Sequence, residues 1–158
     1  MTMETKVLNG EWQVPVPDGF RELGSGEIAR MNTVGEAPQW CAQDEARHII
    51  VSAAWKKSGF AALMLSSKEV AQKMETSLRK AMQPYGYRPE GFVTADVGGL
   101  TADGFRYSYT AQGIGMSGES LSLKKGKTFY YLHCYCRTAL AEESLSVIEE
   151  MLASSAWL

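Results

Sequence analysis

Hydrophobic and polar positions alternate most regularly over Gly104–Thr138, and this pattern predicts three consecutive antiparallel strands. Around Tyr107 aromatic residues alternate with polar ones, and over Ser120–Lys124 leucines alternate with polar residues in the same way. The third segment, Phe129–Arg137, is apolar or aromatic at nearly every position, so both of its faces are hydrophobic. Such a strand usually lies inside a sheet, with one layer packed above it and one below. The pattern therefore predicts a three-layer core.

Two helices are predicted, one on each side of this block in the sequence. The first begins after Ser66 or Ser67, either of which can cap it, and its apolar residues recur every three or four positions until Pro84. The second runs over residues 139–154, with acidic residues in the first turn, where the helix dipole favours them.

The rest of the chain predicts shorter elements. Strands are expected over Trp12–Val16, Glu27–Asn32 and Phe92–Val97, a loop over Thr33–Pro38, and a hairpin from Gln39–Gln43 and His48–Lys56. Trp12–Val16 is expected at a sheet edge, because Pro15 has no N–H to donate to a neighbouring strand. Residues 1–10 are expected to be a lead-in without regular structure. The predicted fold class is α+β: a three-layer α/β/α sandwich around a mostly antiparallel sheet of six to seven strands, forming a single domain over residues 11–158.

Composition narrows the class of protein. The chain has 158 residues, which is typical of one domain, and a net charge of −2. That charge argues against binding to nucleic acid, which usually needs a basic face. No apolar run approaches the roughly 20 residues that cross a bilayer, and the first residues lack the basic and apolar regions of a signal peptide. Three cysteines cannot form a closed disulfide framework and suit a reducing compartment, so we expect a soluble cytoplasmic protein.

Three patterns resemble chemical motifs but lack the context that the chemistry needs. The glycines of Gly113–Gly118 have the spacing of a dinucleotide-binding loop, yet the residues after them alternate as a strand, so a glycine-rich hairpin loop is predicted instead. Cys134 and Cys136, with a distant Cys41, are too few for a usual structural zinc site and are interpreted as buried thiols. Lys124–Lys127 is interpreted as a solvated hairpin tip. No cofactor and no metal are predicted.

The candidate functional residues are mostly aromatic. Four tryptophans and seven tyrosines exceed what a small core needs, and such residues are favoured at binding surfaces. The predicted partner or ligand surface consists of Trp12, Trp40, Trp55, Tyr107, Tyr131 and His133. A hydrogen-bonded core histidine is the favoured interpretation of His133, and a hydrolase-type site around it is the alternative.

In the order and spacing of its elements the chain resembles the PsbP-like superfamily, which includes photosystem PsbP, the Ran-binding nuclear-import factor and bacterial DcrB-like proteins. The resemblance covers Glu11 to Leu158. It rests on Val16–Phe20, His48–Ser52, Tyr85–Tyr87, Gly104–Tyr109, Thr128–Leu132 and Ala153–Trp157. It implies an α/β/α sandwich in proteins that mostly bind other macromolecules, some bacterial relatives being cytoplasmic chaperones or adaptors for secreted effectors. None of the family's functional residues can be matched to a position in this chain.

Together these observations predict a cytoplasmic protein that is not an enzyme and acts as a protein-binding adaptor or chaperone. The alternative is a protein that binds a small apolar ligand between the sheet and a helix. The expected partner is another protein, with neither nucleic-acid binding nor membrane insertion, and the expected state is a monomer or a weak homodimer.

Overall fold

The computed structural model describes residues 4–31, 37–60 and 64–158. Its main element is a seven-stranded sheet whose strands follow the order β3-β4-β5-β9-β8-β7-β6, and all of the pairings are antiparallel. These strands are β3 (Arg21–Glu22), β4 (Trp40–Asp44), β5 (Ile49–Lys57), β6 (Arg88–Val97), β7 (Leu100–Ala111), β8 (Ile114–Lys125) and β9 (Thr128–Arg137). A second sheet has the order β1-β2-β10 and consists of β1 (Glu4–Leu8), β2 (Trp12–Val16) and β10 (Ala156–Trp157).

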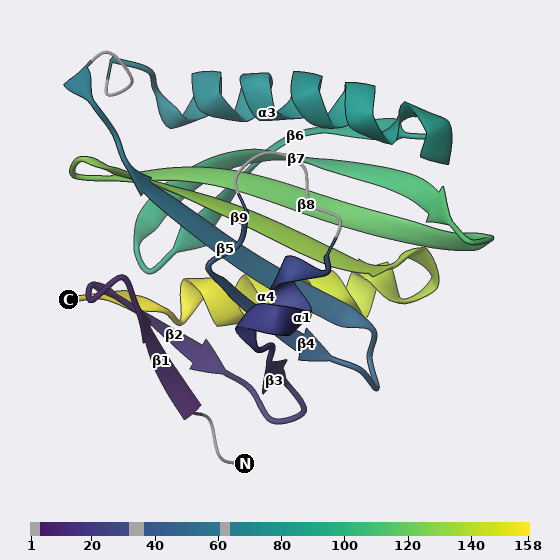
Figure 1. The fold of residues 1–158 in the computed structure, drawn as a ribbon, viewed down its shortest axis with the longest axis horizontal. Coiled ribbons are helices and arrows are strands. Elements are labelled where there is room, and N and C mark those ends of the chain that lie inside the picture. The colour runs from purple at the N-terminus through teal and green to yellow at the C-terminus, as the bar shows by residue number, and fades with distance from the viewer. Residues whose placement is uncertain (1–3, 32–36, 61–63) are drawn as a thin grey trace.

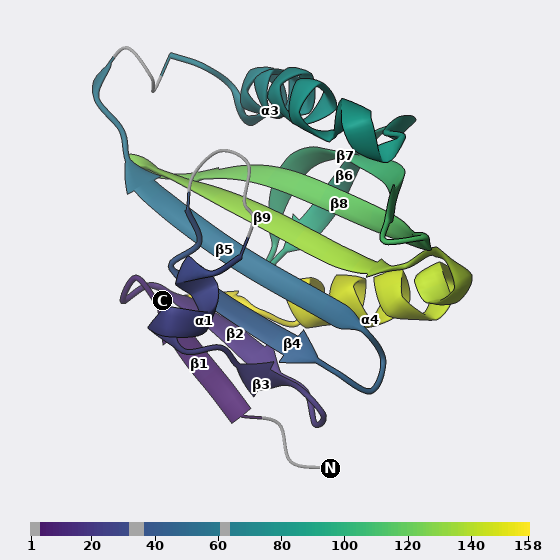
Figure 2. The ribbon, with the colours of Figure 1, turned by 45° about the vertical axis from the view of Figure 1, so that its right-hand side comes forward.

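Helices cover the large sheet on both faces, as Figures 1 and 2 show. Helix α3 (Ser67–Met82) lies over β7 and β8 on one face, and α4 (Ala141–Ala153) packs on the other face beside the small sheet. Ser66 caps α3 in a reciprocal capping box with Glu69, which satisfies backbone N–H groups at the start of that helix. The predicted three-layer α+β sandwich is thus confirmed.

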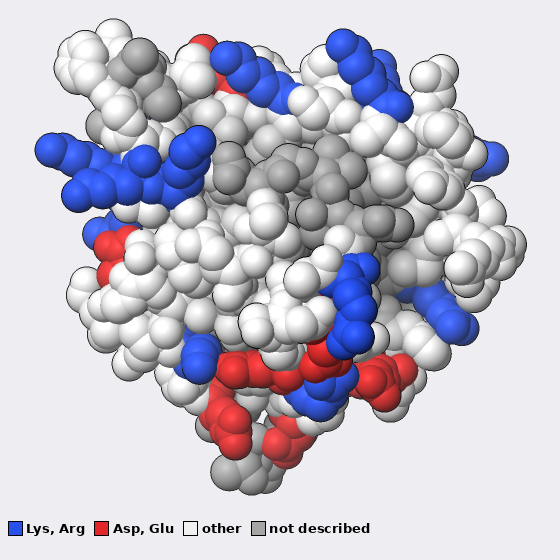
Figure 3. Space-filling model, viewed as in Figure 1, with Lys and Arg blue, Asp and Glu red and all other residues white. Residues whose placement is uncertain are grey.

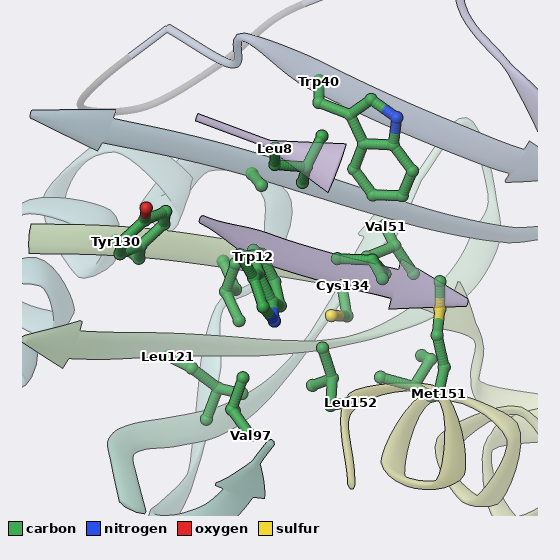
Figure 4. Packing of buried hydrophobic residues seen from close by; sticks show 14 of the residues in the cluster. Leu8, Trp12, Trp40, Val51, Val97, Leu121, Tyr130, Cys134, Met151 and Leu152 are labelled. Carbon is green, nitrogen blue, oxygen red and sulfur yellow. The ribbon is translucent and has the colours of Figure 1, made fainter. Parts of the chain in front are cut away.

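The main hydrophobic core fills the space between the large sheet, the small sheet and α4. It includes Tyr130 and Cys134 of β9, Val51 of β5 and Leu152 of α4 (Figure 4). A smaller core on the opposite face, under α3, contains Leu78, Phe105 and Tyr107. Strand β9 lies inside the sheet between β5 and β8, so the prediction of a central two-faced strand is also confirmed.

The small sheet differs from what the sequence predicts. The expected lead-in contains β1, which pairs antiparallel with β2 from Glu4↔Val16 to Leu8↔Trp12. β2 is the middle strand of this sheet, whereas Pro15 predicted an edge strand. β10 pairs only with Trp12 and Gln13, so Pro15 has a strand neighbour on one side only and its missing N–H costs no ladder bond there.

The predicted strand over Glu27–Asn32 is also wrong. Helix α1 (Ser25–Ala29) occupies the first half of this range, and Asn32, with most of the predicted Thr33–Pro38 loop, lies outside the described residues. A local hydrogen bond explains the helix: the Glu27 carboxylate accepts from the backbone N–H of Gly24 at 3.0 Å and closes a capping box.

The glycine-rich segment is mostly strand instead of hairpin loop. β8 begins at Ile114, and only Gln112 and Gly113 form the turn that precedes it. Gly118 lies opposite Tyr107 in the β7–β8 pairing. A Cβ atom at position 118 would lie 2.4 Å from Cζ of the buried Tyr107 ring. The lack of a side chain at Gly118 therefore makes room for an aromatic ring.

Candidate functional site

The six predicted surface residues do not form one surface, because they lie on opposite faces of the large sheet. Trp12 and Trp40 belong to the main core and Trp55 packs against it, on the α4 side. Tyr107 belongs to the smaller core under α3. Tyr131 and His133 alternate along β9 with core residues Tyr130, Leu132 and Cys134, so their side chains point to the α3 side.

Two of the six are fully enclosed. Trp12 is 1% exposed, stacks on Trp157 at 5.4 Å between ring centroids and meets Tyr130 edge-on at 5.8 Å. Figure 4 shows it projecting from β2 into the main core. Tyr107 is 0% exposed and stacks on Tyr87. These two side chains stabilise the fold and present no surface to a partner.

His133 is held in a hydrogen-bonded group beneath the α3 face. Its Nδ1 lies 2.7 Å from Ser120 Oγ, and the Tyr107 hydroxyl lies 3.5 Å from the same oxygen. The ring also stacks on Tyr135. The two surface clefts described below are lined by neither His133 nor Ser120. This geometry is that of a core histidine.

His133 makes the stability of the fold dependent on pH. Burial lowers the pKa of His133 from 6.5 to about 4, so the unfolded chain binds a proton at this residue at a pH where the folded chain does not. Stability should therefore fall as the pH drops from 6.5 towards 4, and His133 should contribute about 2–3 kcal/mol of that loss.

Urea unfolding at a series of pH values measures this contribution. His133→Gln should remove that part of the pH dependence, whereas His48→Asn, in the exposed turn before β5, should keep the wild-type profile. A His133→Gln profile parallel to that of the wild type would contradict the assignment.

Trp40 and Trp55 both line an open cleft of about 720 Å³. We call this the β1–α1 cleft. Its apolar lining includes Val7, Leu8, Ile28, Met31, Trp40 and Trp55. Figure 2 shows α1 directly above β1, where the two elements border the cleft.

Polar contacts fix the walls of the β1–α1 cleft. Arg21 donates to both carboxylate oxygens of Glu27, at 2.9 and 3.0 Å, and so ties α1 to β3. Together with the Gly24 backbone N–H, this guanidinium lowers the pKa of Glu27 to about 2. At the rim, Lys6 of β1 forms an ion pair with Glu22 of β3 at 3.6 Å. The Trp40 indole N–H also donates to Glu22, at 3.3 Å, and the side chain is otherwise almost enclosed, with 6% of its surface exposed.

The aromatic pattern predicts Trp40 and Trp55 as surface residues but gives no sign of the residues opposite them. The sequence predicts a lead-in at Val7 and Leu8 and a strand at Ile28. One signal in the sequence could have located α1, namely an acidic residue at Glu27 three positions after the cap residue Gly24.

A second cleft, of about 460 Å³, lies between α4 and the turns that follow β2 and β4. Its polar wall is the buried Asp44, whose carboxylate accepts from the backbone N–H and from Nε of Arg47. Gly19 lies against this pair, and a Cβ atom there would be 2.9 Å from Asp44 Oδ2. Because the Asp44 carboxylate already accepts these hydrogen bonds from Arg47, it has little hydrogen-bonding capacity left for a ligand.

The three thiols do not form one cluster. Cys134 lies in the main core, whereas Cys41 neighbours Trp40 and Ala42 along β4 and points to the other face. All three are buried, and burial raises the pKa of Cys41 to about 11. Within residues 4–31, 37–60 and 64–158 no three His, Cys, Asp or Glu side chains are placed to hold a metal ion. None of the helices in that part of the chain is both long enough and apolar enough to cross a bilayer.

Comparison with known proteins gives matches of structure alone. No family model and no curated sequence matches the chain. Cyanobacterial PsbP (CyanoP) from Synechocystis has a TM-score of 0.72 at 8% identity, over 99% of this chain and 92% of that one. LpqN of Mycobacterium tuberculosis, described as involved in cell envelope biogenesis, has a TM-score of 0.60 at 17% identity, over 92% of this chain and 82% of that one. The Ran-binding protein Mog1p of Saccharomyces cerevisiae has a TM-score of 0.58 at 11% identity, over 98% of this chain and 95% of that one.

These likenesses extend over nearly the whole chain and include a PsbP and a Ran-binding protein, two of the groups that the sequence resembles. At such low identities they concern the arrangement of elements and not individual residues. The sequence-based prediction is confirmed at that level: the chain has the PsbP/Mog1-like fold.

Proposed function

We propose that this protein is a non-enzymatic adaptor that binds an extended, apolar segment of another protein in the β1–α1 cleft. The observation that carries the proposal is the combination of two tryptophans with an edge strand at one open cleft. Tryptophan is among the residues that contribute most energy at protein interfaces, because its large ring buries much area at little entropic cost. Mog1p, a protein with this fold, is described as Ran-binding, so the fold is compatible with protein binding.

The position of β1 favours a polypeptide. Lys6, Val7, Leu8 and Asn9 all line the cleft, although consecutive side chains of a strand point to opposite faces. Consecutive residues border one cleft where the cleft meets the edge or the end of the strand. β1 is the outer strand of the small sheet in the described chain, so a partner strand can add there through backbone hydrogen bonds.

The lining indicates what the segment must carry. A strand added to β1 would turn alternate side chains towards Trp40, Trp55 and Ile28, so these should be apolar. The Lys6–Glu22 ion pair presents both charges at the rim, and it suits a segment with polar residues between the apolar ones.

The alternative occupant is a small apolar molecule, because about 720 Å³ also suits a ligand of drug size. An open cleft bordered by an edge strand favours the peptide. The two occupants differ in one measurable respect, since only a polypeptide yields a covalent peptide adduct under photocrosslinking.

The test is site-specific photocrosslinking in cells of the source organism. A photoreactive phenylalanine analogue replaces Val7, which is 43% exposed at the cleft. The matched control replaces Ile114, which is 40% exposed at the start of β8. Position 7 should give a discrete adduct whose crosslinked peptide, identified by mass spectrometry, contains alternating apolar residues.

A second substitution tests whether the adduct depends on the cleft. Ile28→Asp, combined with the crosslinker at position 7, should abolish the adduct while circular dichroism shows a folded protein. Equal adducts at positions 7 and 114, or no adduct at position 7, would overturn the proposal.

A further inference from the structure

In the part of the chain that the structure describes, five lysines lie together at one corner of the large sheet. In the sheet register Lys57 and Lys125 flank Thr128, and Lys56 and Lys124 flank Phe129. Lys127 lies in the turn between β8 and β9, so the hairpin tip found in the sequence gains two more cations from β5. Figure 3 shows basic side chains gathered at this corner, at the upper left, while most of the acidic ones on the same face lie towards the bottom.

Two large apolar side chains project from the same corner. Phe60 is 83% exposed and Met64 is 73% exposed. The chain near each of them is anchored to the lysine hairpin: Ser58 N–H donates to the Lys127 carbonyl at 2.8 Å, and Lys124 Nζ donates to the Leu65 carbonyl at 3.3 Å. Neighbouring Cα atoms are about 3.8 Å apart, so Phe60 lies within about 8 Å of the first anchor and Met64 within about 4 Å of the second.

We infer that this corner, formed by the five lysines with Phe60 and Met64, docks on an anionic membrane surface. Lysines near such a surface are attracted by its negative potential, and apolar side chains between them enter the boundary between headgroups and acyl chains. The proposal requires no helix that crosses the bilayer. It is distinct from the adaptor function, because the residues that carry it do not line the β1–α1 cleft.

The combination of charge and apolar exposure favours a membrane over other anionic partners. A nucleic acid or an acidic protein would neutralise the lysines, but its charged surface would leave the Phe60 and Met64 side chains in water. The overall charge of −2 means that the attraction is local to this corner. A lipid surface satisfies both features at once, because its charged headgroups lie directly over an apolar interior.

Vesicle co-sedimentation tests the inference with the full chain. Vesicles of phosphatidylcholine containing phosphatidylserine should bind the protein, vesicles of phosphatidylcholine alone should bind it weakly, and added sodium chloride should reduce the binding. Lys57→Glu combined with Lys127→Glu should lower the partition coefficient at least about 25-fold, since each lysine near the surface contributes about fivefold. Phe60→Ser should lower it about tenfold.

Matched variants separate this corner from a general effect of charge or hydrophobicity. Lys80→Glu with Arg88→Glu changes the net charge equally at the far end of α3, and Ile114→Ser removes another exposed apolar side chain. Both should bind like the wild type. Equal loss in the control variants, absence of binding to anionic vesicles, or a patch that binds DNA in place of vesicles would each overturn the inference.

Discussion

Replacing Trp12 by alanine should lower the free energy of unfolding by about 3–5 kcal/mol. The indole is 1% exposed and packs between Trp157 and Tyr130, so its removal leaves a cavity lined by side chains from β2, β9 and the C-terminal strand. A loss of this size is a large fraction of the stability of an ordinary domain. Urea unfolding, followed by circular dichroism, measures it.

A conservative variant shows whether the cavity is the cause. Trp12→Phe keeps an aromatic ring in the site and should cost only about 1–2 kcal/mol. A Trp12→Ala protein within about 1 kcal/mol of the wild type would mean that the small sheet is not packed as described. The result also affects any binding experiment, because a partner lost by Trp12→Ala would report unfolding and not a lost contact.

Replacing Arg106 by methionine should cost about 3 kcal/mol, because it leaves a buried carboxylate without its cation. Arg106 donates from Nε to Glu119 at 2.6 Å, and Glu119 is 2% exposed. The same guanidinium reaches Glu149 of α4 at 2.9 Å, but that carboxylate is well exposed and its ion pair should contribute little.

The double variant is the informative control for this pair. Arg106→Met with Glu119→Leu replaces both charges by apolar groups, and it should recover most of the stability that Arg106→Met loses. Glu149→Gln alone should cost less than about 1 kcal/mol. A double variant as unstable as Arg106→Met would show that the guanidinium acts through packing and not through its charge.

The sequence was sufficient to predict those elements whose hydrophobic pattern extends over many neighbouring residues. β7, β8 and β9 are each at least ten residues long and carry an alternating or two-faced hydrophobic pattern, and α3 has both a capping box and an apolar stripe. Patterns of this kind depend on neighbours in the sequence, so they can be recognised without knowledge of the tertiary structure. The two-faced β9 even predicted a layer on each side of the sheet.

Elements that depend on distant partners could not be predicted in this way. β1 is exposed at four of its five residues and is defined by pairing with β2, while α1 is only five residues long. The candidate residues are divided between the two faces of the sheet for the same reason. An aromatic side chain in a strand faces one side or the other according to register, and nothing local distinguishes the enclosed Trp12 from Trp55 at the cleft.

The pairing of β2 with β10 has a consequence for synthesis of the protein on the ribosome. Gln13 and Trp12 find their partners in Ala156 and Trp157, and the Leu158 N–H donates to the Glu11 carbonyl at 2.8 Å. At ribosomal rates of about 5–20 residues per second, β2 emerges on the order of ten seconds before these partners. Until then its large apolar side chains have no complete core to enter. The small sheet, and with it one wall of the β1–α1 cleft, is therefore among the last parts to form, so a nascent chain would not yet be able to hold a partner there.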